Sequence, residues 1–195
     1  MPYLNGINII LNGNKATEFL SFRQNKIDFI NDIDPTFKDE IFNKNGELRK
    51  EWEGKIILNT GPYLNTEYLG ILMQHPQNGI LNKKIIRQAI SYGIDKKKLI
   101  MYLRNSAGKP GEQGFIPTGL AGYDSNSTYG YVYNPKKAIT LLQSAGYGFG
   151  KKIPAIHLST VPAYADLASF ISKELNKIGI ELIIDVVPKS LLLSQ

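Results

Sequence analysis

The chain has no cysteine, two histidines and one tryptophan among its 195 residues. Without cysteine it can form no disulfide, no thiolate zinc site and no thiol nucleophile. The two histidines, His75 and His157, lie far apart in the sequence, whereas a zinc site needs several ligands at close spacing. We therefore expect no metal site and no bound cofactor.

Long apolar runs and a signal sequence are also missing. No apolar run approaches the roughly 20 residues that a membrane-spanning helix needs. The first residues contain no basic region followed by an apolar stretch, so they do not resemble a signal peptide. The chain stops at Gln195 inside an apolar segment, which is unusual for a natural C-terminus. We interpret the chain as a piece of a larger protein; a cytoplasmic protein is the alternative.

The length of the chain fits one domain or at most two small ones. Charge is unevenly distributed along it. The net charge is +6, with −2 in residues 1–67 and +8 in residues 68–195. A basic second part indicates either an anionic partner or the absence of compensating charges that belong to a larger protein.

Strand-like and helix-like patterns alternate along the sequence. Runs rich in β-branched residues predict strands over 7–11, 26–30, 55–58, 67–73, 154–159 and 180–187. Apolar residues at helical spacing predict helices over 16–25, 36–42, 85–94, 135–143 and 163–177. We also expect Asn82 and Asp95 to cap helices and Gly146 to end one. The alternation predicts a single α/β domain over residues 1–195, with a long irregular stretch between 104 and 133.

Motifs for catalysis are missing. The sequence contains no Gly-x-Ser-x-Gly elbow, no phosphate-binding P-loop and no His-Glu-x-x-His. Acidic residues gather between Asp28 and Glu40, but without the spacing and the glycine of a calcium-binding loop. We expect a solvated acidic surface and no enzymatic activity.

Basic residues gather between positions 83 and 104, and nucleic acids bind to basic surfaces. Lys83, Lys84 and Arg87 lie opposite the apolar stripe of the helix predicted over 85–94, which is typical of a solvated helix face. Further basic residues follow at 96–98 and 104, but no recognised nucleic-acid-binding motif accompanies them. A free-standing basic domain that binds nucleic acid or another anion is kept as the alternative function.

Tyrosines gather near the end of the long irregular stretch, at positions 123, 129, 131 and 133. A tyrosine offers an apolar ring with a polar hydroxyl, which suits contact with a ligand. The same side chains can instead anchor the loop onto the domain. The sequence leaves both interpretations open.

Residues 82–100, with the sequence NKKIIRQAISYGIDKKKLI, resemble a characteristic segment of the bacterial extracellular solute-binding proteins of family 5. This family includes the oligopeptide-, dipeptide- and nickel-binding proteins of ABC importers. Further segments resemble the family in the expected order, at residues 3–7, 22–29, 68–71, 114–117, 134–147 and 175–180. The resemblance extends over nearly the whole chain, but its motifs are mainly structural, so they indicate a fold more than a ligand.

The resemblance implies a class II, periplasmic-binding-protein-like fold with two lobes, of which this chain would supply mainly the second, mixed-sheet α/β lobe. Residues 1–12 would include a strand near the hinge between the lobes. The full protein would be a non-catalytic substrate-binding component that delivers oligopeptides or dipeptides to a membrane permease. It would be periplasmic or a cell-surface lipoprotein, and the isolated chain would be a monomer that binds no nucleic acid.

Candidate ligand-binding residues follow from the rule that ligands of open α/β sheets lie outside the carboxyl ends of strands. Ser159 ends one predicted strand, and Thr160 begins the link to the following helix, whose free amides can hold a carboxylate. Val187 ends the last predicted strand, and Pro188 and Lys189 follow it.

The resemblance adds three expectations about this site. Some relatives have a tryptophan that packs on the peptide where this chain has Lys189, so Lys189 could instead contact a ligand carboxylate. Tyr68 is a further candidate, on a predicted strand near the cleft. The aspartate that holds the α-amine in peptide binders of the family lies outside this sequence, so we expect the isolated chain to bind peptide weakly or not at all.

Overall fold

The computed structural model describes residues 3–73, 76–148 and 150–192, and the chain divides into two compact units. Unit 1 comprises Met1–Leu58 and Arg104–Ser106, and unit 2 comprises Asn59–Leu103 and Ala107–Gln195. The expected single domain thus consists of two units. Its assignment to mainly one lobe of a larger protein stays a prediction.

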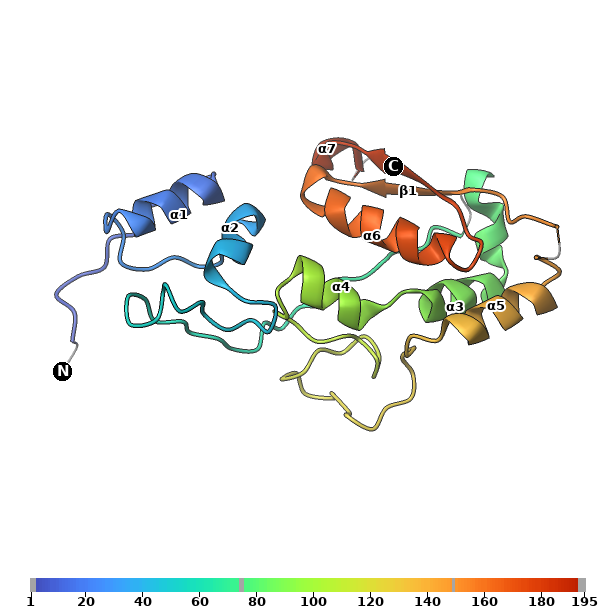
Figure 1. Ribbon diagram of the computed structural model, residues 1–195, viewed down its shortest axis with the longest axis horizontal. Coiled ribbons are helices and arrows are strands. Elements are labelled where there is room, and N and C mark those ends of the chain that lie inside the picture. The colour runs from blue at the N-terminus through green and yellow to red at the C-terminus, as the bar shows by residue number, and fades with distance from the viewer. Residues whose placement is uncertain (1–2, 74–75, 149, 193–195) are drawn as a thin grey trace. The chain divides into compact units, whose positions relative to one another are not determined.

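Unit 1 contains helices α1 (Lys15–Arg23) and α2 (Pro35–Ile41), close to the predicted positions (Figure 1). The side chains of Asn14 and Asp34 cap the two helices by accepting hydrogen bonds from backbone N–H groups. Phe19 is fully buried, with its ring centroid 4.8 Å from that of Phe37 and 6.3 Å from that of Trp52. An aromatic cluster therefore forms the small core of this unit.

Several acidic residues of unit 1 are paired with basic side chains. Arg23 contacts Glu40 at 3.0 Å, and Lys44 contacts Asp39 at 2.5 Å. Asn105 also donates to the Asp39 carboxylate, at 2.7 Å, and so ties residues 104–106 to α2. These contacts give the acidic segment a structural role within unit 1.

Asp39 makes the stability of unit 1 depend on pH. Hydrogen bonds from Lys44 and Asn105 hold the pKa of Asp39 below its ordinary value. Its stabilising effect is therefore present above the unfolded-state pKa, near 3.9, and is lost as the pH falls through the lower folded-state pKa. We expect Asp39→Asn to reduce the free energy of unfolding at pH 7 by up to about 1 kcal/mol, as for exposed ion pairs.

Thermal unfolding followed by Trp52 fluorescence measures this effect. The difference between wild type and Asp39→Asn should shrink as the pH falls through the lowered folded-state pKa of Asp39. Asp28→Asn serves as the control, because Asp28 is exposed on the same unit. A deficit of the same size above and below the folded-state pKa would rule out the assigned role of the carboxylate.

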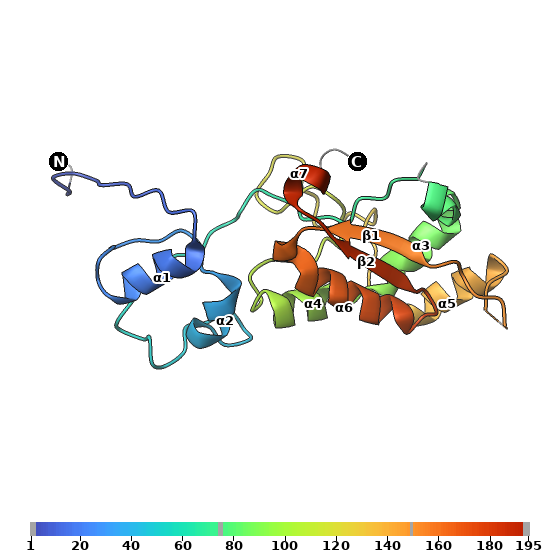
Figure 2. The same ribbon diagram turned by 90° about the horizontal axis from the view of Figure 1, so that it is seen from above.

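Unit 2 is built around a parallel pair of strands joined by a helix. The strands β1 (Ile156–Thr160) and β2 (Leu182–Val186) pair in register from Ile156 opposite Leu182 to Thr160 opposite Val186. Helix α6 (Ala165–Asn176) connects them and packs along them (Figure 2). The other elements are η1 (Pro76–Asn82), α3 (Lys84–Gly93), α4 (Lys96–Leu103), α5 (Pro135–Ser144), η2 (Pro162–Tyr164) and α7 (Lys189–Leu192).

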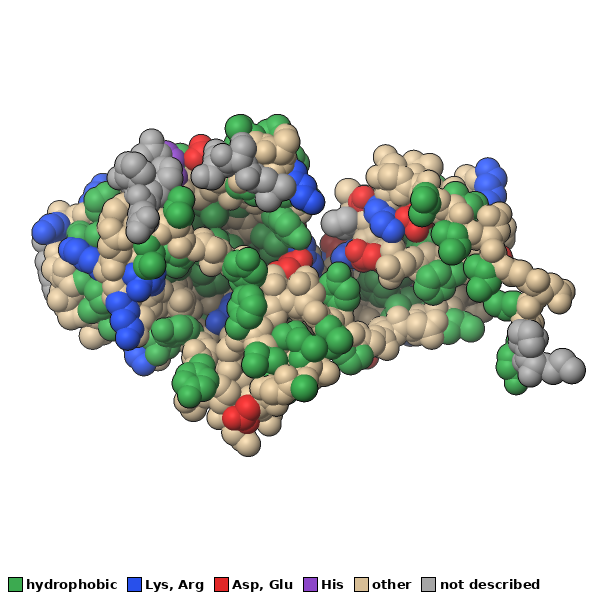
Figure 3. All heavy atoms as spheres, turned by 180° about the vertical axis from the view of Figure 1, so that it is seen from behind, with side chains coloured by type: hydrophobic (Ala, Val, Ile, Leu, Met, Phe, Trp, Pro, Cys, Tyr) green, Lys and Arg blue, Asp and Glu red, His purple; other side chains and the backbone are tan. Residues whose placement is uncertain are grey.

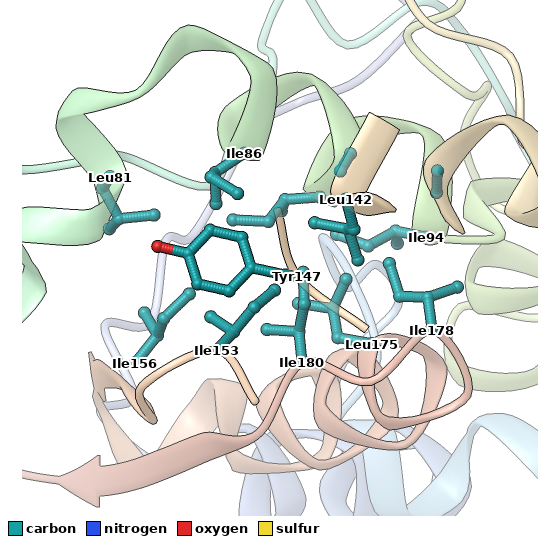
Figure 4. Packing of buried hydrophobic residues seen from close by; sticks show 13 residues of the cluster. Leu81, Ile86, Ile94, Leu142, Tyr147, Ile153, Ile156, Leu175, Ile178 and Ile180 are labelled. Carbon is teal, nitrogen blue, oxygen red and sulfur yellow. The ribbon is translucent and has the colours of Figure 1, made fainter. Parts of the chain in front are cut away.

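The core of unit 2 is a cluster of buried apolar side chains from α3, α5, α6 and the segments beside the strands (Figure 4). Ile86 and Ile180 are completely buried, and Leu175 is 1% exposed. The ring of Tyr147 lies within this cluster, where the amino groups of Lys83 and Lys151 approach it to 5.3 and 5.5 Å. The apolar stripe predicted in residues 85–94 is thus confirmed as the buried face of α3.

The helix ends agree with the sequence except at one position. Asp95 accepts from the backbone N–H of Lys98 at 2.9 Å and caps α4, and Gly146 follows α5 with a φ of +83°. The predicted cap Asn82 is wrong, because Lys83 is the N-cap of α3 and makes no side-chain capping bond. Asn82 instead ends η1, and its carbonyl accepts a hydrogen bond from Arg87.

Four predicted strands are wrong. Residues 7–11, 26–30, 55–58 and 67–73 form no strand in the described part of the chain, so the expected strand within residues 1–12 is also wrong. A strand needs a hydrogen-bonded neighbour, and these segments have none in the described sheet. Their apolar side chains remain exposed, for example Ile7 at 79% and Ile57 at 89%. Apolar side chains are visible on the surface of each unit in Figure 3.

Candidate ligand-binding site

Five of the six predicted site residues lie together where β1 and β2 end. Thr160 pairs with Val186 at the last position of the register, and the N–H of Val187 donates to the Thr160 carbonyl at 2.8 Å. We call the site formed by these five residues the carboxyl edge: Ser159, Thr160, Val187, Pro188 and Lys189. The parallel pairing creates this juxtaposition, because it brings the carboxyl ends of both strands to one side.

The carboxyl edge combines a buried threonine, Thr160, with an exposed lysine, Lys189. Thr160 is 9% exposed, Ser159 and Val187 are partly buried, and Pro188 and Lys189 are exposed. Lys189 begins α7, and no carboxylate in the described part of the chain pairs with it. Its ammonium group is therefore available to an anionic group of a ligand.

The start of α6 differs from the expected row of free amides. The short helix η2 precedes it, and the N–H of Ala165 donates to the Pro162 carbonyl. The N–H of Leu167 donates to the carboxylate of Asp166 at 2.7 Å. A side-chain carboxylate thus already occupies part of this helix start, which argues against a ligand carboxylate there.

Tyr68 lies outside the carboxyl edge, in a segment that contacts the turn after β1. Its ring lies edge-on to Phe115, with centroids 5.3 Å apart, and the Thr66 hydroxyl donates to the Phe115 carbonyl at 2.8 Å. The preceding residue, Glu67, accepts a hydrogen bond from the hydroxyl of Tyr164, the last residue of η2. This bond ties the segment of Tyr68 to the turn that follows β1.

Sequence reasoning missed Glu67, Phe115 and Tyr164. Phe115 lies in the segment 114–117 that resembles the family, and Tyr164 lies in the turn after β1, but neither carried a chemical motif. The contact between Glu67 and Tyr164 joins residues 97 positions apart. A signal of that kind arises only when the chain is folded.

Two of the clustered tyrosines anchor the long irregular segment. The ring of Tyr131 lies edge-on to Tyr92, with centroids 5.0 Å apart, and the Tyr131 carbonyl accepts from Lys96 at 2.5 Å. Burial and the Glu174 carboxylate raise the pKa of Tyr133, whose hydroxyl bonds to Glu174. Burial lowers the pKa of Lys96. These contacts favour the anchoring interpretation for Tyr131 and Tyr133.

Four basic residues of the segment 83–104 make contacts within unit 2. Arg87 donates to the carbonyls of Leu81 and Asn82, and Lys96 donates to the carbonyl of Tyr131. Lys83 lies over the ring of Tyr147, and Lys97 pairs with Glu112 at 3.4 Å. Because these side chains hold unit 2 together, the arrangement argues against the nucleic-acid alternative.

Two cavities are lined by described residues other than those of the carboxyl edge. One, of about 370 Å³, lies in unit 2 beside α4 and is lined by Asp95, Glu112 and Tyr133 among others. The second, of about 550 Å³, lies in unit 1 around Arg23 and Trp52. Neither is lined by any of the six predicted site residues.

Neither a metal-binding cluster nor a membrane-spanning helix occurs among the described residues. Among the described residues, no three His, Asp or Glu side chains gather as a metal site would need, and no helix is long and apolar enough to cross a membrane. His75 lies outside the described residues, whereas the Nδ1 of His157 lies 3.1 Å from Asp185. His157 thus has a carboxylate partner on the neighbouring strand.

Comparison with known proteins identifies relatives of this chain. The family described as "Bacterial extracellular solute-binding proteins, family 5 Middle" matches residues 1–194. The dipeptide-binding protein of Escherichia coli K12 is 28% identical over 137 residues, which is 68% of this chain and 25% of that protein. The chain thus spans about a quarter of the length of this curated relative.

Solved structures with the same fold include two peptide complexes. The periplasmic binding protein DppA from Helicobacter pylori, bound to the peptide STSA, has a TM-score of 0.68 and 24% identity. The match covers 92% of this chain and 32% of that protein. The oligopeptide-binding protein AppA from Bacillus subtilis, bound to a nonapeptide, has a TM-score of 0.66 and 20% identity, covering 93% of this chain and 36% of that one.

A third structure contains a metal complex. NikA from Brucella suis with Fe(III)-EDTA has a TM-score of 0.67 and 20% identity, and the match covers 93% of this chain and 37% of that protein. These likenesses confirm the predicted fold, which is that of the two-lobed periplasmic binding proteins. Because the family match extends over residues 1–194, the chain belongs to the bacterial extracellular solute-binding proteins of family 5.

Proposed function

We propose that the protein containing this chain captures oligopeptides or dipeptides and delivers them to the permease of an ABC importer. Two of the structural relatives hold peptides, and the E. coli relative is a dipeptide-binding protein. The full-length protein would work in the periplasm or, as a lipoprotein, at the cell surface. The NikA relative with Fe(III)-EDTA makes a metal complex the second ligand class to test.

The carboxyl edge is the observation that carries this proposal. It places the partly buried Ser159 and Val187 beside Lys189, whose ammonium group has no carboxylate partner in the described chain. A peptide carboxylate suits such a cation, because charge-assisted hydrogen bonds are among the stronger polar contacts. Lys189 therefore takes the role of a contact to the ligand carboxylate.

Binding by the proposed mechanism needs both lobes of the larger protein. Proteins that close two lobes around a ligand bury it by hinge motion, so each lobe supplies only part of the contact. The chain spans about a third of the length of the structural relatives. We accordingly expect the isolated chain to bind peptide far more weakly than the full-length protein.

Isothermal titration calorimetry on the natural full-length protein tests the proposal, with di- to pentapeptides as ligands. We expect Lys189→Gln to weaken binding of peptides with a free carboxylate by about tenfold, as for one charge-assisted hydrogen bond, and to leave C-terminal amides unchanged. Lys152→Gln is the matched control, because Lys152 is exposed and precedes β1 at the opposite end of the strands.

Three outcomes separate the alternatives. Peptide binding that depends on Lys189 supports the proposal, including the role of the carboxyl edge. Binding of a metal chelate but of no peptide would show that the ligand is a metal complex and would contradict the proposed peptide ligand. Binding of a DNA or RNA oligonucleotide that weakens steeply with rising salt, in place of peptide binding, would contradict the proposed function.

A further inference from the structure

We propose that Glu67, positioned by Tyr164, recognises a positively charged group on the bound ligand. The inference rests on the proposed function and adds a specificity-determining residue at the same site. It predicts that the protein prefers peptides with an ammonium or guanidinium group near β1. The group is the α-amine or a basic side chain; both offer the same chemistry to a carboxylate.

The position of Glu67 is set by contacts on both sides of it in the sequence. Thr66 and Tyr68 contact Phe115, through a hydrogen bond of 2.8 Å and a ring pair at 5.3 Å. Glu67 lies between them, and its Oε1 accepts from the Tyr164 hydroxyl at 3.5 Å. Because Tyr164 ends the turn that follows Thr160, this bond brings the carboxylate to the turn after β1, beside the carboxyl edge.

The charge of Glu67 is not neutralised within the described chain. The carboxylate is exposed, its partner Tyr164 is a neutral hydroxyl, and no lysine, arginine or histidine of the described residues pairs with it. Other acidic groups of unit 2 do form ion pairs, such as Glu112 with Lys97. A second carboxylate, Asp166, follows η2 but already accepts from the N–H of Leu167.

The opposite charges on the two strand ends match a zwitterionic ligand. Glu67 lies beside the turn that follows β1, and Lys189 follows β2, whose last residue pairs with Thr160. A ligand across this edge meets a carboxylate at one strand end and an ammonium group at the other. Opposite charges in this arrangement select the orientation of the ligand as well as its charge.

Calorimetry on the natural full-length protein tests the proposal with four tripeptide probes. They are Ala-Ala-Ala, N-acetyl-Ala-Ala-Ala, N-acetyl-Ala-Lys-Ala and N-acetyl-Ala-norleucine-Ala. We expect Glu67→Gln to weaken binding of cationic probes by about tenfold and to change binding of the uncharged acetylated probes by less than about twofold. Tyr164→Phe should give a smaller loss with the same preference for cationic probes.

Glu181→Gln is the matched control, since Glu181 is exposed and immediately precedes β2 at the opposite end of the strands. It removes the same charge and should leave all four affinities unchanged. If only Ala-Ala-Ala responds to Glu67→Gln, the carboxylate reads the α-amine. If only the lysine probe responds, it reads a side chain.

Other results overturn the inference in distinguishable ways. Peptide binding that Glu67→Gln leaves unchanged, or weakens equally for cationic and uncharged probes, overturns the role of Glu67 and leaves the proposed function intact. A wild-type protein that binds none of the probes nor any di- to pentapeptide overturns both.

Discussion

Replacing Ile180 by alanine is expected to reduce the free energy of unfolding of unit 2 by about 2–5 kcal/mol. Ile180 is completely buried in the cluster that α3, α5 and α6 share, and it lies two residues before β2. The substitution removes apolar contacts and leaves a cavity that the surrounding helices fill only in part. Chemical denaturation of the 195-residue chain, followed by circular dichroism, measures the loss.

Ile183→Ala provides the matched control for this substitution. Ile183 is on β2 and is 41% exposed, so the same change of side chain removes fewer buried contacts. We expect a loss below about 1.5 kcal/mol there. Equal losses at positions 180 and 183 would show that the assigned core does not carry the stability of unit 2.

Replacing Gly130 by alanine is expected to displace part of the long irregular segment and to cost about 1–3 kcal/mol. A Cβ at this position would lie 2.3 Å from the carbonyl oxygen of Glu112 and 2.9 Å from the amide nitrogen of Gly114. Both atoms belong to the backbone, so the clash cannot be relieved by rotating a side chain. The segment that leads into Phe115 must then move.

The displacement connects Gly130 to ligand binding, because Phe115 packs on Tyr68, which is one of the candidate site residues. We expect Gly130→Ala to weaken peptide binding by the full-length protein as well as to lower its Tm. Gly61→Ala is the control, since a Cβ there meets nothing within 4 Å. Unchanged stability and affinity in Gly130→Ala would contradict the observed packing of this segment.

The helices and the two paired strands of unit 2 could be predicted because their signals are local. The apolar stripe of α3, the cap Asp95 and the glycine after α5 each act within a few residues. The four wrong strands show the limit of such signals, because a β-branched run such as 7–11 becomes a strand only beside a partner. No sequence pattern at 7–11 reveals whether that partner is present.

The candidate site, too, could be predicted from the sequence only in part. The rule about carboxyl ends correctly grouped Thr160 with Val187, because a βαβ unit forces its two parallel strand ends together. The contact of Glu67 with Tyr164 depends on how distant segments fold onto unit 2, so no local pattern announced it. The expectation of free amides at the start of α6 is wrong. The N–H groups of Ala165 and Leu167 already donate to the Pro162 carbonyl and the Asp166 carboxylate.

Photo-crosslinking is the most direct test of the claim that a peptide binds at the carboxyl edge. A tripeptide carrying benzoylphenylalanine is irradiated with the natural full-length protein, and the labelled residues are located by mass spectrometry. We predict that the labels within this chain fall on residues 159–164, 187–189 and 67–68, and that unlabelled peptide competes for them. Competed labelling confined to the opposite ends of the strands, around Lys152 and Glu181, or absent from this chain altogether, would contradict the account.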